Sequence, residues 1–219
     1  MLVNIANENL LLLPEKAIYW QRKKILFVSD THFGKSSTFR MSGIPVPEGG
    51  LSNDLKKLSM VIEKSKAEKI FYLGDFFHSR MGKTPSVLEA VLEWRTAYES
   101  IEMNLIRGNH DYHSGDPDDE LSISCFDEPY MLSPFILKHE PEKSGDGYVL
   151  CGHIHPSISL HGKGDTSLKA HCFFFTKNFA VLPAFGNFTG TYKVRPKESD
   201  RVFAVADNHI FEINPKLFR

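Results

Sequence analysis

The stretch Arg107-Gly108-Asn109-His110-Asp111 comes directly after the largely apolar run of residues 103–106. An Asn, a His and an Asp behind a glycine are poorly suited to a core, because each side chain needs a hydrogen-bond partner or a metal ion. The stretch therefore predicts a buried strand that ends at a functional site.

Four other strand-like runs end in polar clusters of the same kind. The clusters are Ser29-Asp30-Thr31-His32, Gly74-Asp75, Lys138-His139 and Cys151-Gly152-His153-Ile154-His155. In an α/β sheet, ligands bind in the crevice outside the carboxyl ends of the strands. We therefore expect the Asp, Asn and His side chains of all five runs to converge in one crevice.

The composition is that of an ordinary soluble globular protein, with 42% hydrophobic and 24% charged residues. A chain of 219 residues fits one domain spanning residues 1–219. The formal net charge of -1 means that the whole chain is no polycation. Any contact with nucleic acid would have to rely on a local basic patch or on metal ions.

The cysteines and the apolar runs bear on the compartment. Cys125, Cys151 and Cys172 are widely spaced and form no C-x-x-C pair, which argues against a disulfide framework and a structural zinc site. No apolar run approaches the ~20 residues of a membrane span, and the N-terminus lacks the basic start of a signal peptide. We expect a cytoplasmic protein without a membrane partner.

The first half of the chain predicts alternating strands and helices. Strands are expected at residues 9–13, 17–20 and 25–28, and the Gly-, Ser- and Pro-rich segment 33–50 is expected to be a long loop. Leu51, Leu55, Leu58 and Ile62 recur at helical spacing and predict an amphipathic helix over 51–66.

A second helix is expected to follow Thr84-Pro85, which has the form of an N-cap and a first-turn proline, and to end near residue 100. Strands before and after these two helices predict a parallel sheet. From residue 121 onward, strand-like runs follow one another with little helical periodicity, which predicts a largely antiparallel second sheet. The fold class predicted is α/β, a four-layer sandwich of two mixed β-sheets flanked by helices.

The polar side chains at the strand ends suit a metal centre. Seven oxygen and nitrogen donors without a thiolate are too many for one tetrahedral zinc and suit two divalent ions of the Mn, Fe or Zn type. These donors are Asp30, His32, Asp75, Asn109, His139, His153 and His155. A carboxylate such as Asp75 can bridge two ions, which would hold a hydroxide for in-line attack on a phosphodiester.

Four motifs in order carry a family resemblance: Asp30-x-His32, Gly74-Asp75, Gly108-Asn109-His110-Asp111 and Gly152-His153-x-His155. Together they resemble the calcineurin-like metallophosphoesterase superfamily. Other stretches resemble its bacterial ICC-like branch of ligase-associated DNA-damage-response endonucleases: Leu13-Pro14-Glu15, Gly43-Ile44-Pro45-Val46-Pro47, Lys138-His139-Glu140-Pro141 and Leu182-Pro183-Ala184-Phe185-Gly186-x-Phe188-Thr189-Gly190.

The resemblance implies a metallophosphatase-like sandwich and a metal-dependent phosphodiesterase or nuclease that acts on DNA, with DNA ligase or helicase as repair partners. It implies Asp30, His32, Asp75 and His155 on a first metal, and Asp75, Asn109, His139 and His153 on a second. Manganese is the first choice of metal, with iron, zinc and magnesium as alternatives. His110 would stabilise the phosphate or protonate the leaving alkoxide, and Asp111 would hold the His110 tautomer.

Weaker candidates surround this set. Four side chains are candidates for contact with a substrate phosphate, although packing or exposure explains them equally well: Lys35, His78, Arg80 and Arg107. A basic rim would consist of Lys35, Arg40, Arg80, Lys83, Arg107, Lys163 and Lys177. Phe173-Phe174-Phe175 is interpreted as sheet packing rather than a base-stacking platform, and Cys151 as buried and inert.

Two other functions remain open at the level of sequence. One is the same chemistry on a small nucleotide or a phosphoprotein, which a panel of substrates would distinguish. The other is a non-catalytic scaffold on the same fold, which the intact donor set and His110 disfavour.

Overall fold

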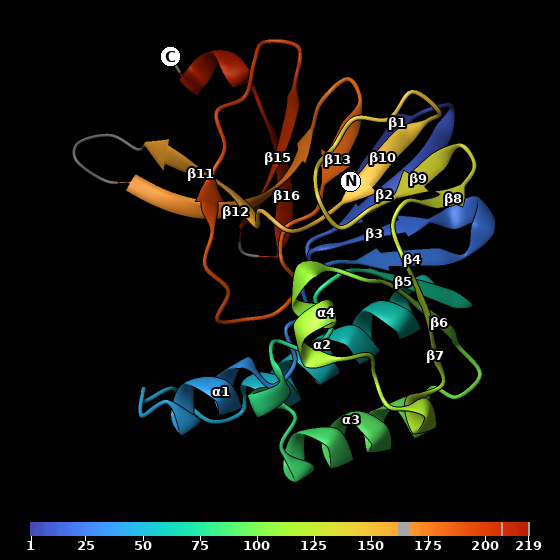
Figure 1. The fold of residues 1–219 in the computed structure, drawn as a ribbon. Helices are drawn as coiled ribbons and strands as arrows, with labels where there is room; N and C mark the ends of the chain where they lie inside the picture. Colours follow the sequence, from blue (N-terminus) through green and yellow to red (C-terminus); the bar gives the residue numbers. More distant parts are fainter. Residues whose placement is uncertain (162–166, 207, 219) are drawn as a thin grey trace.

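The computed structural model describes residues 1–161, 167–206 and 208–218. Two β-sheets pack against each other, and the α-helices lie on the first sheet's far side (Figure 1). The predicted fold class, an α/β sandwich of two mixed sheets with helices, is confirmed. Within the described ranges, no helix is long and apolar enough to cross a membrane.

The first sheet has the strand order β1-β2-β3-β4-β5-β6-β7. Neighbours from β1 to β4 are antiparallel, and those from β4 to β7 are parallel. Because β4, β5 and β6 are parallel, the polar clusters after them leave the same edge of the sheet. The strands are β1 (Leu2–Ile5), β2 (Glu8–Leu13), β3 (Ala17–Trp20), β4 (Ile25–Val28), β5 (Lys69–Leu73), β6 (Glu102–Ile106) and β7 (Ile123–Phe126).

Helices α2 (Gly50–Ser65) and α3 (Pro85–Ala97) cover the outer face of this sheet. The predicted apolar face of α2 is buried, and Val87, Val91 and Trp94 of α3 are buried likewise. Pro85 stands at the start of α3 as predicted, although the helix ends at Ala97 rather than near residue 100. The remaining helices are short: α1 (Lys35–Met41), α4 (Asn109–Ser114), η1 (Gln21–Lys23), η2 (Arg80–Gly82), η3 (Asp119–Leu121) and η4 (Pro215–Phe218).

The second sheet has the order β14-β11-β12-β13-β10-β9-β8, with β15 paired to β12 and β16 paired to β15. Of its eight described pairings, five are antiparallel, and β10 runs parallel to both β9 and β13. The strands are β8 (Tyr130–Leu132), β9 (Phe135–Leu137), β10 (Tyr148–Cys151), β11 (Pro156–His161), β12 (Ser167–Phe175), β13 (Phe179–Val181), β14 (Tyr192–Lys193), β15 (Arg201–Ala206) and β16 (His209–Ile213).

Side-chain alternation along the strands divides the interior into two layers. In β4, Leu26 and Val28 face the helices, whereas Ile25 and Phe27 face the second sheet. The layer between the sheets is aromatic, and the Trp20 and Phe135 rings meet edge to face with centroids 5.0 Å apart. The two sheets are therefore held together directly behind the strand ends that carry the polar clusters.

Two expectations about the elements were wrong, and two short strands were not predicted. Segment 33–50 contains α1, because its helix breakers lie at its ends and the run Lys35–Met41 has neither Gly nor Pro. The chain after residue 121 does not pass straight to the second sheet, since β7 extends the first sheet beside β6. The short strands β1 and β14 were not expected.

The expectation for the triple phenylalanine run is confirmed. Phe173 and Phe175 are buried between the sheets, and half-buried Phe174 faces the other side of β12. Cys151 is buried in β10 as predicted, with its thiol donating to the Ala180 carbonyl at 3.3 Å.

Truncation of Phe173 tests the inter-sheet layer. We expect Phe173→Ala to lower the free energy of unfolding by about 3–5 kcal/mol, because it empties a fully buried aromatic position. Phe211→Ala is the matched control, since this side chain is 51% exposed and its loss should cost less than about 1 kcal/mol. Urea unfolding followed by circular dichroism measures both, and equal losses would contradict the layer assignment.

Candidate metal centre

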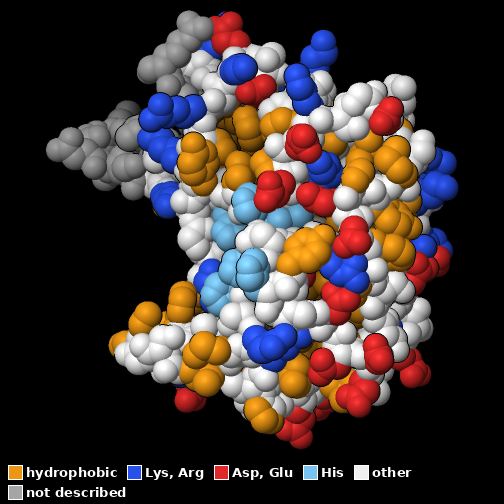
Figure 2. All heavy atoms as spheres, viewed as in Figure 1, with side chains coloured by type: hydrophobic (Ala, Val, Ile, Leu, Met, Phe, Trp, Pro, Cys, Tyr) orange, Lys and Arg blue, Asp and Glu red, His pale blue; other side chains and the backbone are white. Residues whose placement is uncertain are grey.

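The structure brings all seven candidate ligands together at one edge of the sandwich. Asp30 and His32 follow β4, Asp75 follows β5, and Asn109 opens α4 after β6. The second sheet supplies His139 after β9 and the pair His153 and His155 after β10. Figure 2 shows the histidine side chains gathered on one face of the molecule. The crevice expected from the sequence is therefore built from both sheets.

One group of donor atoms consists of Asp30, His32, Asp75 and His155. His155 Nε2 lies 3.3 Å from Asp30 Oδ1. His32 Nε2 lies 3.4 Å from His155 Nε2 and 3.7 Å from Asp75 Oδ2. These are the four residues that the resemblance implies for a first metal.

A second group consists of Asp75, Asn109, His139 and His153. His139 Nε2 lies 3.0 Å from Asn109 Oδ1, 3.0 Å from His153 Nδ1 and 3.5 Å from Asp75 Oδ1. His153 Nδ1 is also 3.1 Å from Asn109 Oδ1. Asp75 thus presents Oδ2 to the first group and Oδ1 to the second.

The spacing and chemistry of these atoms fit divalent cations. Ligands bound at about 2.0–2.2 Å to one ion stand about 3.0–3.5 Å apart, and the donor contacts of the two groups span 3.0 to 3.7 Å. His139 Nδ1 contacts the Leu73 carbonyl at 3.0 Å, and His155 Nδ1 contacts the Gly190 carbonyl at 2.9 Å. A carbonyl accepts only, so each Nδ1 donates, and Nε2 is the ring atom that faces the carboxylates. This is the arrangement by which a histidine binds a metal ion through Nε2.

The electrostatics of the buried groups favour the same conclusion. Burial lowers the pKa of His32 to about 2, which keeps this ring neutral and able to ligate. Burial raises the pKa of Asp75, and the neighbouring Asp30 carboxylate adds to that rise. Burial opposes protonation of His139, but Asp30 and Asp75 outweigh it and raise the His139 pKa. Asp30 and Asp75 are only 0% and 2% exposed, and buried carboxylates of this kind are stable when a positive charge lies beside them.

Five of the seven candidate ligands have left-handed backbone conformations. Their φ angles are 52° at Asp30, 46° at His32, 57° at Asp75, 73° at His153 and 49° at His155. A non-glycine residue in this region costs of order 1 kcal/mol or more and persists only where the surroundings impose it. The tight turns after β4, β5 and β10 therefore direct the ligand side chains toward the centre, although their backbone conformation is unfavourable by itself.

Steric crowding explains why the motifs have glycine at residues 74, 108 and 152. A Cβ on Gly74 would lie 2.0 Å from His139 Nδ1, and one on Gly108 would lie 2.4 Å from Asp75 Oδ1. A Cβ on Gly152 would lie 2.4 Å from Asp30 Oδ2. Each glycine thus leaves room for a ligand that comes from a different loop.

His110 lies beside the two donor groups, and a carbonyl orients it. Its Nδ1 is 2.6 Å from the His78 carbonyl oxygen, and its backbone N–H donates to Asp75 Oδ1 at 2.9 Å. The His78 ring stacks on the His110 ring with centroids 4.8 Å apart, and its Nδ1 lies 3.4 Å from His32 Nδ1. Burial lowers the pKa of His78 to about 4, so this ring is neutral.

The predicted role of Asp111 was wrong. Its carboxylate accepts from the backbone N–H groups of Asp75 at 2.7 Å, Gly108 at 2.8 Å and Phe76 at 3.0 Å. Asp111 therefore locks the Gly-Asp and Gly-Asn-His-Asp loops to each other, while the His78 carbonyl orients the His110 ring. Burial raises the Asp111 pKa to about 6, and the three amides oppose that rise.

The predicted phosphate contacts and basic rim are only partly assembled. Arg107 donates to Asp116 at 2.7 Å and to Asp127 at 2.9 Å, so its guanidinium is engaged by two carboxylates instead of facing the centre. Lys83 donates to the carbonyls of Gly115 and Asp116. The candidate ligands His153 and His155 follow the carboxyl end of β10, and β13 runs parallel to β10. Lys177 precedes β13, so it lies at the opposite end of the sheet from the centre.

Of the other rim residues, Lys35 faces the centre. Burial lowers the pKa of Lys35, while the charges of Asp75 and Asp30 act in the opposite direction. Arg40 and Arg80 are exposed on α1 and η2. Lys163 lies outside the described residues.

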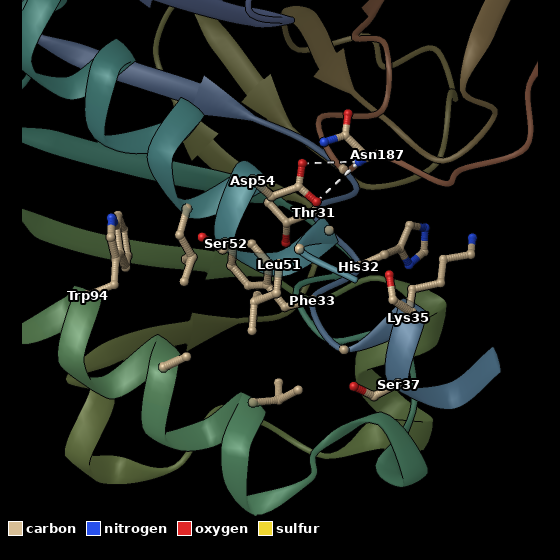
Figure 3. A pocket seen from close by; sticks show the side chains of 18 of the residues that line it. Thr31, His32, Phe33, Lys35, Ser37, Leu51, Ser52, Asp54, Trp94 and Asn187 are labelled. Carbon is tan, nitrogen blue, oxygen red and sulfur yellow. Dashed lines mark hydrogen bonds between the residues drawn. The ribbon is translucent and has the colours of Figure 1, made fainter. Parts of the chain in front are cut away.

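Residues 182–190 form a brace that the motif analysis did not explain. Phe185 and Gly186 donate backbone N–H groups to the carbonyls of Ser29 and Asp30. Helix α2 holds this brace, since Asp54 accepts from the Asn187 backbone N–H at 3.2 Å (Figure 3) and Lys57 donates to the Phe185 carbonyl. The Gly190 carbonyl at its end orients His155. Backbone carbonyls carry no side-chain signal, so sequence reasoning missed these contacts.

Comparison with known proteins now decides the family. The calcineurin-like phosphoesterase model matches residues 23–179. The chain belongs to the calcineurin-like phosphoesterase family. It is a metal-dependent phosphoesterase, and members of this family use divalent metals.

A solved structure at 34% identity agrees with this calcineurin-like phosphoesterase assignment. The Pseudomonas putida nuclease MPE is 34% identical, with a TM-score of 0.87, over 97% of this chain and 99% of that chain. The Escherichia coli phosphoesterase Yfce is 15% identical, with a TM-score of 0.42, over 87% of this chain and 98% of that one. A search of curated proteins found no match.

A single methyl group tests the steric role of the motif glycines. Gly108 has an ordinary φ of -99°, so Gly108→Ala adds a clash with Asp75 and His139 without backbone strain. We expect a loss of about 1–3 kcal/mol in the free energy of unfolding and a weaker affinity for Mn²⁺ in calorimetric titration.

Gly145→Ala is the matched control, because nothing lies within 4 Å of its added Cβ. If the two variants were equal in stability and Mn²⁺ affinity, the steric account would be refuted.

Proposed function

We propose that this calcineurin-like phosphoesterase is a dinuclear metal-dependent phosphodiesterase that hydrolyses DNA as an endonuclease. The observation that carries the proposal is Asp75, whose two carboxylate oxygens face two different donor groups. A nuclease with 34% identity over 97% of this chain supports the choice of DNA. A role in DNA repair beside a ligase or helicase rests only on the family resemblance of residues 13–15, 43–47, 138–141 and 182–190.

The ligand set of the proposed centre follows from the donor groups. One ion would be held by Asp30, His32, Asp75 and His155, and the other by Asp75, Asn109, His139 and His153. When bound, two divalent ions lower the pKa of a water nucleophile and neutralise charge on the phosphate. The mixed nitrogen and oxygen donors suit Mn²⁺ as the working metal.

His110 supplies the proton in this proposal. Because its Nδ1 donates to the His78 carbonyl, Nε2 is the ring atom left for substrate. When the ring carries a proton on Nε2, that proton can pass to the leaving oxygen. Lys35, which feels the charges of Asp75 and Asp30, would add positive charge near the phosphate.

The first test is turnover with and without metal. We expect Mn²⁺ to support hydrolysis of bis-p-nitrophenyl phosphate and of single-stranded DNA, and EDTA to abolish both activities. Asp75→Asn should reduce the rate by at least about 10², because it removes the bridging charge. Turnover that persists in EDTA, or that survives Asp75→Asn unchanged, would refute the dinuclear proposal.

A second test separates proton donation by His110 from positioning. An alkoxide needs protonation when it leaves, whereas p-nitrophenolate is a good leaving group without it. His110→Ala should therefore lower the single-turnover rate on DNA by about 10² and lower the rate on bis-p-nitrophenyl phosphate much less.

The exposed His209, on β16, provides the control variant His209→Ala, which should retain both rates. Equal losses on the two substrates after His110→Ala would reduce His110 to a positioning residue.

A further inference from the structure

A cavity of about 590 Å³ lies next to the metal centre, between α1, α2, α3 and residues 186–189 of the brace (Figure 3). Thr31 and His32 line it at the end nearest the candidate ligands, and Trp94 lines it on α3. It is thus continuous with the site described above, yet no candidate ligand other than His32 belongs to it. Pockets of about 300–1,000 Å³ are typical of sites for small organic ligands.

The wall of the cavity is apolar on its inner side. Phe33, Leu51, Leu55 and Val87 line it together with the indole of Trp94. Phe33, Leu55 and Val87 are buried in the core beneath α2 and α3, so the wall is firmly packed. Such a surface suits the face of an aromatic heterocycle, which gains from contact with rings and aliphatic side chains.

The side toward α1 is polar and positive. Lys35 and Arg40 line it, as do the hydroxyl-bearing residues Ser36 and Ser37. Arg40 is exposed and donates to the Ser37 hydroxyl at 3.4 Å. Lys35 lines this cavity and also feels the charges of the Asp30 and Asp75 carboxylates. The charge of this side complements a sugar-phosphate chain that continues from the metal centre.

We propose that the cavity is a subsite for one unstacked nucleoside of a single-stranded substrate, adjacent to the scissile phosphate. The base would lie against Phe33, Leu51 and Trp94, and its flanking phosphate would lie near Lys35 and Arg40. Bases stacked inside a duplex cannot enter such a pocket, whereas an extruded or unpaired base can. This inference rests on the proposed phosphodiesterase function and names the form of its substrate.

Filling the cavity tests the subsite. Ala90 lines it from α3 and is half-buried, so Ala90→Phe places a ring where the base would lie. We expect the KM for a single-stranded oligonucleotide to rise about tenfold or more, because base stacking is lost. Turnover of bis-p-nitrophenyl phosphate, which has no base, should stay within about twofold. Thr96→Phe, on the exposed side of α3, is the matched control and should leave both substrates unchanged.

Binding without turnover gives an independent measurement. In the Asp75→Asn background, fluorescence anisotropy should show a labelled oligothymidylate bound, and adding Ala90→Phe should weaken that binding about tenfold or more. Arg40→Gln should weaken it and flatten its salt dependence. If Ala90→Phe does not fold, Ser52→Phe, at the α2 side of the cavity, replaces it with the same expectations.

The subsite is refuted if a folded filling variant keeps the wild-type KM and affinity for the oligonucleotide. It is equally refuted if both substrates lose activity in parallel, because the cavity would then serve only to support the centre. Failure of the proposed function looks different, since the wild-type protein would then fail to hydrolyse bis-p-nitrophenyl phosphate with Mn²⁺.

Discussion

The placement of the Asp75 carboxylate is the interaction on which the rest of the site depends. One oxygen faces His32 and the other faces His139, so a side chain from the first sheet joins donors from both sheets. The residue is 2% exposed and its backbone is left-handed, and Asp111 holds its N–H. A buried carboxylate among histidine nitrogens and other carboxylates is unfavourable without a positive charge. The proposed cations would remove this unfavourable term, which would strengthen their binding.

The scaffold around Asp75 is built to tolerate such a site. The aromatic layer between the sheets fixes the strand ends, so the loops can adopt left-handed turns that would not persist in isolation. Glycines at the motif positions admit ligands from neighbouring loops, and the Asp111 carboxylate satisfies three amides that those loops leave unpaired. The packed sheets thus supply the stability of the fold, whereas the loops contain the strained backbone conformations and the buried charges.

Backbone carbonyls set the proton chemistry of the histidines. The carbonyls of Leu73, Gly190 and His78 each face the Nδ1 atom of one ring, which leaves the Nε2 atoms of His139, His155 and His110 for metal or substrate. The brace over residues 182–190 links this arrangement to α2, and α2 also forms a wall of the adjacent cavity. The metal centre and the cavity therefore share one structural support.

The sequence by itself determined most of the strands, both long helices and the choice of the seven candidate ligands. It did so because apolar periodicity and strand-end polarity are local signals, and parallel strands bring such ends together. It could not show that Arg107 pairs with two aspartates or that Asp111 binds amides instead of His110. Nor could it show which Asp75 oxygen faces which group. Those outcomes depend on contacts between residues of different loops, which only the folded chain brings together.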